Sequence, residues 1–224
     1  MEIMRNYSFE DRHASIGIGA MIVFIALVLV SGIAASVIIS TSTTLESQAM
    51  STGRETTAEV STGLAVSAIE GYAASNSNIS KLAILVRPRA GTEYVDIGNC
   101  FVELCNKTVK VILNYTSSYY SDPDGLDNIF SASVFPDYGG TGDATQFGLL
   151  VLEDADNSVS GPTPIINRGD KVYLCFNTTG VFSDIPVRTE IWGMIVPEEG
   201  APGMISFTTP GTYASNVMEL FWDM

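Results

Sequence analysis

The sequence has few of the residues on which enzymes and metal sites commonly depend. Only one of its 224 residues is histidine, His13, and only three are cysteines. It contains no Cys-x-x-Cys pair, nucleophile elbow or zinc spacing, and the glycine-rich run at 139–142 lacks the lysine of a phosphate-binding loop. Because histidine is the commonest general base and metal ligand, we predict no enzyme, no cofactor, and no catalytic or metal-binding residues.

Charge is absent from a long stretch near the N-terminus. No Asp, Glu, Lys, Arg or His occurs between Ser15 and Leu45, and the strongly apolar part runs from Ile16 to Ile39. As a helix this part would be ~36 Å long at ~1.5 Å per residue, enough to cross a bilayer core of ~30 Å. It is apolar on all sides, so it must be buried all round, in lipid or among other helices.

A polar segment, 1–14, precedes this apolar run. A secretory signal has a shorter apolar region, of ~7–15 residues, with a small-residue cleavage site after it. Here the apolar run is longer and no such site follows it. We therefore place the processing point before the run, between Ala14 and Ser15, where cleavage keeps the apolar helix in the mature protein.

The helix is predicted to continue well beyond Ile39. No proline occurs from Thr41 to Tyr72, and apolar residues recur there mainly at intervals of four. We therefore expect a leader at 1–14, a helix at 15–77 and a second domain at 78–224. Small residues four apart allow close helix packing, although they are also common in membrane helices: Ser31 with Ala35, and Gly32 with Ser36.

From Ile79 the pattern changes to short alternating or apolar runs between Pro, Gly, Asn and Asp. Such runs indicate β-strands joined by turns. About ten short strands in roughly 145 residues favour an antiparallel, immunoglobulin-like β-sandwich, so the whole chain is predicted to be α+β. Strands are expected at 79–86, 94–97, 100–104, 108–115, 129–135, 147–152, 171–177, 187–196, 204–208 and 217–222.

The chain is strongly acidic, with a formal charge of −14. Such a surface repels nucleic acid and anionic membranes and keeps an exposed protein soluble, so we expect no nucleic-acid partner. Its three cysteines, if exported, form either one disulfide and a free thiol or three buried thiols. The positions of Cys100, Cys105 and Cys175 leave the pairing open.

Two further motifs lie in the predicted β-domain. Asp122, Asp124 and Asp127 cluster in one loop. Alternating carboxylates can bind Ca²⁺, but the loop lacks the remaining spacing of an EF-hand, and a solvated Pro-Asp-Gly turn is the simpler interpretation. Asn-x-Ser/Thr sequons, which accept N-glycans on exported proteins, occur in this domain at Asn78, Asn106, Asn114 and Asn177.

Both ends of the chain resemble one known family. The segment Ser15-Ile-Gly-Ile-Gly-Ala-Met-Ile-Val-Phe-Ile-Ala-Leu-Val-Leu-Val30 is similar to the N-terminus of archaeal flagellins (archaellins), within the type IV pilin-like superfamily. The segment Gly193-Met-Ile-Val-Pro-Glu-Glu-Gly-Ala-Pro-Gly-Met-Ile-Ser-Phe-Thr-Thr-Pro-Gly-Thr-Tyr213 is similar to their closing segment. One departure is His13, which stands before Ala14 where the family usually has Lys or Arg.

This resemblance implies a structural subunit of the archaeal swimming filament, the archaellum. A prepilin-like peptidase would remove the leader from a precursor held transiently in the cytoplasmic membrane. Membrane assembly machinery would then join identical subunits through their N-terminal helices into an extracellular filament, with the β-sandwich outside and commonly glycosylated. The alternative is an archaeal type IV adhesive pilin or a membrane-tethered ligand-binding sandwich domain, which shares the leader and helix but not the closing segment.

Overall fold

The structure is a computed structural model that describes residues 3–74, 77–122, 125–137 and 144–222, with side chains from Ile16 onward. The chain divides into two compact units, 1–55 and 56–224. Asp124 and the glycine-rich run at 139–142 lie outside the described residues.

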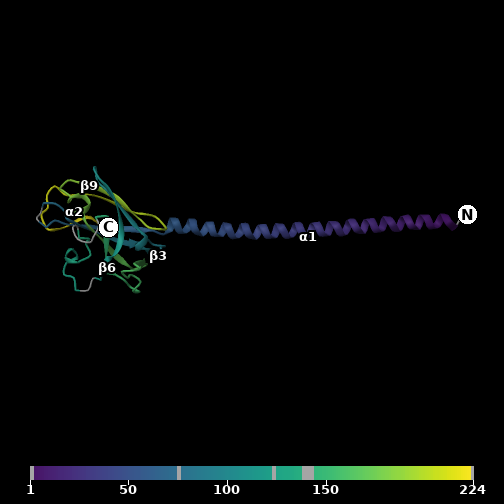
Figure 1. Ribbon diagram of the computed structural model, residues 1–224, viewed down its shortest axis with the longest axis horizontal. Coiled ribbons are helices and arrows are strands. Elements are labelled where there is room, and N and C mark those ends of the chain that lie inside the picture. The colour runs from purple at the N-terminus through teal and green to yellow at the C-terminus, as the bar shows by residue number, and fades with distance from the viewer. Residues whose placement is uncertain (1–2, 75–76, 123–124, 138–143, 223–224) are drawn as a thin grey trace. The chain divides into compact units, whose positions relative to one another are not determined.

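The first element is one continuous helix, α1, from Ile3 to Ser61 (Figure 1). It contains no proline, and side-chain hydroxyls in its second half donate hydrogen bonds to backbone carbonyls of the same helix. The hydroxyl of Thr41 donates to the Val37 carbonyl, and the hydroxyl of Thr44 donates to the Ser40 carbonyl. These bonds satisfy side-chain donors locally, so the helix needs no partner for them.

The expected helix of 15–77 is wrong at its C-terminal end, because α1 stops at Ser61 and strand β1 begins at Leu64. Gly63 separates them with φ of +140°, outside helical geometry and readily adopted by glycine alone. Its backbone also lies against Ala201, where an added Cβ would collide with the carbonyl oxygen. The four-residue spacing of Leu64, Ala68 and Tyr72 misled the prediction, because four is a multiple of the strand period of two as well as one helical turn.

The strands among the described residues, β1 included, form one large sheet and one small one. The large sheet has the order β10-β9-β4-β5-β6-β8-β2-β1-β11, and the small sheet pairs β3 with β7. All pairs are antiparallel except β5 with β6, which is parallel. The strands are β1 Leu64–Tyr72, β2 Lys81–Pro88, β3 Tyr94–Asp96, β4 Phe101–Cys105, β5 Lys110–Ser121, β6 Gln146–Glu153, β7 Ile165–Asn167, β8 Lys171–Asn177, β9 Glu190–Val196, β10 Gly203–Thr208 and β11 Val217–Trp222.

Most expected strands are confirmed within a few residues of their predicted ends. The prediction missed β7 and three short helices, η1 Ile97–Asn99, η2 Ile129–Ser131 and α2 Thr178–Phe182. Side chains from both halves of the large sheet, such as Leu104 of β4, Ile195 of β9 and Phe176 of β8, meet in one buried cluster. The expected α+β fold, a long helix followed by a largely antiparallel sandwich, is confirmed.

A second buried cluster lies on the other face of β1, β2, β6 and β8. The sequence predicts a strand at 129–135, but this segment instead forms η2 and an irregular chain that covers this face. Phe130 stacks on Tyr72 with ring centroids 5.3 Å apart, and Lys81 Nζ donates to the Phe130 carbonyl at 2.8 Å. This cover explains the continuous apolar runs of β2, β6 and β8, because a strand buried on both faces does not alternate.

Strand β1 pairs with both β2 and β11, so we predict that a fragment starting at 78 cannot hold the fold. Leu64 and Ile69 are fully buried, and each contributes ~1.5–3 kcal/mol to a domain whose total stability is ~5–15 kcal/mol. Fragment 62–224 should melt cooperatively by circular dichroism, whereas fragment 78–224 should not. Equal melting curves would show that β1 is dispensable.

Candidate functional site

The most unusual surface of the chain is the apolar half of α1. Every large apolar side chain from Ile16 to Ile39 is 55–71% exposed. Among the described residues, α1 is the one helix long and apolar enough to cross a membrane. An exposed apolar patch of this extent marks a surface that is covered by lipid or by another protein.

This exposed surface surrounds the helix instead of following one stripe. Val23, Phe24 and Ile25 point in different directions around the axis, because successive residues turn by ~100°, and all three are exposed. At Gly17, Gly19 and Gly32, no atom outside the local helix backbone lies within 4 Å of the point that a Cβ would occupy. The surface therefore offers both bulky side chains and points where another helix backbone can approach closely.

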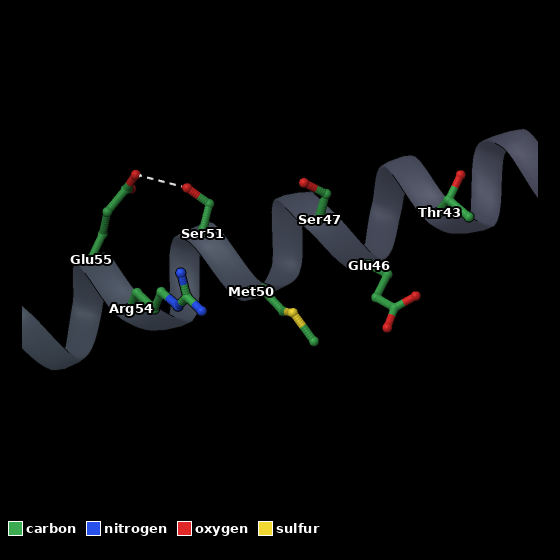
Figure 2. Close-up of a pocket in the computed structure, with 7 residues that line it drawn as sticks. All are labelled: Thr43, Glu46, Ser47, Met50, Ser51, Arg54 and Glu55. Atoms are coloured by element: carbon green, nitrogen blue, oxygen red, sulfur yellow. Dashed lines mark hydrogen bonds between the residues drawn. The ribbon is translucent and has the colours of Figure 1, made fainter.

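The polar half of α1 differs in chemistry. Figure 2 shows Thr43, Glu46, Ser47, Met50, Ser51, Arg54 and Glu55, which line a shallow groove on this helix. Ser47, Ser51 and Glu55 project to one side, and the Ser51 hydroxyl bonds the Glu55 carboxylate at 3.1 Å (Figure 2). The helix thus changes from apolar to hydroxyl-rich near Ser40, and its groove brings together no catalytic pair.

The expected cleavage site lies within this same helix. Ala14 and Ser15 belong to the continuous helical backbone of α1, and the side chains before Ile16 are not described. The cleavage site therefore stays a prediction of the sequence.

The four sequons differ in how free their amides are. Asn78 and Asn114 are exposed. Asn106 Oδ1 accepts from the backbone N–H groups of Thr108 and Val109 at 2.8 and 2.6 Å. Asn177 caps α2, and its Nδ2 donates to the Pro136 carbonyl at 2.9 Å. Exposure therefore favours Asn78 and Asn114 as acceptors.

All three cysteines are free thiols in the structure. Burial, with the nearby charge of Asp96, raises the pKa of Cys100 to about 12. Burial also raises the pKa of Cys175, whereas Cys105 is only half-buried. A thiol kept protonated is a poor nucleophile, so Cys100 and Cys175 act as small core residues. The sequence left open one disulfide with a free thiol or three buried thiols; the structure has three free thiols, of which Cys100 and Cys175 are buried and Cys105 is half-buried.

The acidic loop singled out in the sequence is described only in part, so its three carboxylates stay a prediction of the sequence. Asp122 Oδ1 accepts from the Tyr120 hydroxyl at 2.9 Å, and Asp124 lies outside the described part of the chain. The carboxylates that do gather are Asp154, Asp156 and Asp170, which have oxygen atoms all within 4.8 Å of one another.

This aspartate cluster joins the loop after β6 to the turn between β7 and β8. Asp170 is 1% exposed and accepts from Asn167 N at 2.8 Å and Ala155 N at 3.3 Å. Hydrogen bonds from Ser158 and then Asn167 lower the pKa of Asp156. The three carboxylates could hold a hard cation, and they also fix both loops by accepting backbone N–H groups. Sequence reasoning missed the cluster because Asp170 is distant in sequence from the Asp154-x-Asp156 pair.

We predict that Asp170→Ala destabilises the β-domain by about 1–3 kcal/mol per donor left unpaired, because two backbone N–H groups lose a buried acceptor. Urea unfolding of fragment 62–224 measures this change. Glu93→Ala, at an exposed carboxylate, is the matched control and should change the unfolding free energy little. An Asp170→Ala fragment as stable as the Glu93→Ala fragment would contradict a structural role for the cluster.

Comparison with known proteins identifies relatives over nearly the full chain. A family model described as archaeal-type flagellin matches residues 14–207. Flagellin B3 of Methanocaldococcus jannaschii is 40% identical over 94% of this chain and 97% of its own length. Flagellin B3 of Methanococcus voltae is 38% identical over 97% of this chain and all of its own length.

Two solved structures resemble the fold. The crystal structure of archaeal flagellin FlaB1 from M. jannaschii has a TM-score of 0.59 and 34% identity, covering 71% of this chain and 96% of its own. A subunit in the archaeal flagellum of Methanospirillum hungatei has a TM-score of 0.60 over 90% of this chain and 98% of its own. The latter is only 16% identical, so it supports the fold alone.

Proposed function

This chain belongs to the archaeal-type flagellin family, and we propose that it is a structural subunit that polymerises through α1 into the archaellum, the archaeal swimming filament. It is not an enzyme. Family membership over both ends of the chain favours this function over an adhesive pilin or a membrane-tethered binding domain.

The observation that carries the proposal is the apolar half of α1, whose large side chains are all exposed. Burying a large aliphatic side chain contributes ~1.5–3 kcal/mol, so leaving Ile16–Ile39 in water is strongly unfavourable. Lipid supplies an apolar environment for the precursor. Once the helix leaves the membrane, other copies of the same helix supply an equivalent one, and a contact that repeats without closing builds a helical polymer.

The acidic β-domain suits the outside of such a filament. Its core is complete without α1, since the buried clusters consist of residues from Leu64 onward. A chain charge of −14 keeps exposed protein soluble. The mature subunit therefore resides in a filament on the cell surface, and its precursor resides in the cytoplasmic membrane.

Processing precedes assembly in this proposal. A prepilin-like peptidase cuts between Ala14 and Ser15, and separate membrane machinery assembles the product. Two observations support this position: the polar segment precedes the apolar run, and the family match begins at residue 14. N-terminal sequencing of filament subunits should read Ser15-Ile-Gly-Ile-Gly; a chain beginning at Met1 or after Ile39 would refute the proposed processing.

Substitution of one core residue tests the role of the helix. We predict that Ile25→Asp leaves membrane insertion and processing nearly normal, because the cost at the membrane centre is only ~2.5–3.5 kcal/mol. Filament assembly should be abolished, because the buried charge repeats in every subunit and costs several kcal/mol even after relaxation.

Immunoblotting of the processed chain and electron microscopy of filaments report on the two steps separately. Ile25→Leu is the matched control and should process, assemble and swim normally. Full-length filaments from Ile25→Asp cells would show that this helix is not the packed core.

We further propose that the exported domain carries N-glycans at its sequons, Asn78, Asn106, Asn114 and Asn177. Exposure predicts higher occupancy at Asn78 and Asn114, because Asn177 already donates to Pro136. Glycopeptide mass spectrometry of filaments should find these two sites the most occupied. A filament with unmodified Asn78 and Asn114 would contradict this ranking.

A further inference from the structure

The large sheet has β10, β9, β4 and β5 on one side and β6, β8, β2 and β1 on the other. These two halves differ in what covers their outward faces. The segment around η2 covers β1, β2, β6 and β8. On the other half, Val102, Leu104, Ile191 and Ile205 point into the core, so the alternate residues of the same strands point outward. Several of these outward residues are large and apolar; we call them the β4/β9 face, and they are Phe101, Ile112, Trp192, Met194 and Met204.

This face is exposed in the isolated chain. Met204 is 63% exposed, Ile112 52%, Trp192 40% and Phe101 37%. The sheet register places them together: Met204 pairs with Met194, Met194 with Glu103, and Glu103 with Ile112. Phe101 is two residues from Glu103 on the same side of β4, which makes the surface continuous across four strands.

The charged residues on this face are paired. Lys110 Nζ lies 2.7 Å from Glu103 Oε1, and Lys107 Nζ lies 3.8 Å from Glu190 Oε2. Glu103, Lys110 and Glu190 are the charged residues among those that alternate with the core residues on β4, β9, β10 and the first half of β5, and each belongs to one of these pairs. This surface is therefore apolar and carries no unpaired charge.

We propose that the β4/β9 face contacts the β-domain of a neighbouring copy of this chain. The proposal rests on the filament function proposed above. Two copies that each carry a large negative charge repel one another, so they can meet closely only through neutral surfaces such as this one. A basic partner would instead be attracted to the acidic surfaces, and an anionic membrane would repel the chain.

A native thiol reports on this contact. Cys105 is half-buried and follows Phe101 and Glu103 on the same side of β4. Its modification by N-ethylmaleimide, measured by peptide mass spectrometry, should be severalfold slower in intact filaments than in subunits dissociated by detergent. The buried Cys100 and Cys175 should stay unmodified in both samples, which verifies that the domain is folded.

Two outcomes would overturn the proposal. Equal modification of Cys105 in filaments and in dissociated subunits would show that no copy covers the face. Asn114 pairs directly with Phe101 at one end of the face, so the glycan proposed there borders the contact and leaves the part from Ile112 to Met204 for the neighbouring copy. Slow modification in both samples that Asn114→Gln relieves would show instead that the glycan covers the whole face. Either result leaves the filament function intact, whereas the absence of filaments containing this chain would contradict that function itself.

A substitution tests the same contact independently. Met204→Glu adds a negative charge to the β4/β9 face. Leu152→Glu is the control, because it adds the same charge at an exposed apolar residue near the C-terminal end of β6, outside that face. Dissociated subunits of both variants should melt alike. Met204→Glu filaments should be short or dissociate at lower temperature, and Leu152→Glu filaments should resemble the unsubstituted ones. Equal filament stability of the two variants would overturn the proposal.

Discussion

The structure depends on one constraint: residues 16–39 form a helix that is apolar on every side, and the chain itself buries none of its large apolar side chains. Water cannot be the final environment of such a helix. A bilayer satisfies the constraint for a precursor, and a bundle of identical helices satisfies it for a polymer. The absence of charge from Ser15 to Leu45 suits both environments, so one segment can serve first as an anchor and then as an assembly element.

The β-domain buries its own apolar residues, so it does not need α1 to complete its core. Its sheet encloses one core, and the segment around η2 buries the outward face of β1, β2, β6 and β8. The aspartate cluster then fixes two loops at one end through buried acceptors such as Asp170. Acidic residues outnumber basic ones in this domain, whereas the β4/β9 face carries no unpaired charge. The two parts of the chain therefore differ in chemistry. The helix α1 is apolar and suits polymerisation, whereas the β-domain is charged, packs its own core and stays soluble.

Sequence reasoning succeeded where a pattern had one physical meaning. The uncharged, apolar run predicted a helix, which α1 confirms, and the runs of β4 and β10 predicted strands, whose burial alternates as expected. It failed at 64–72, where four-residue spacing fits a helix and a strand alike, and where the contact of Gly63 with Ala201 decides the outcome. It also failed at 129–135 and at Asp170, because a covering segment and a carboxylate cluster depend on contacts between residues distant in sequence.

The central claim, that copies of α1 bury one another, is tested most directly by a cryo-electron microscopy reconstruction of filaments formed by this chain. The account predicts that side chains from Ile16 to Ile39 of neighbouring subunits interdigitate along the filament axis without intervening water. A filament in which these side chains face solvent, or in which subunits contact one another only through their β-domains, would contradict it.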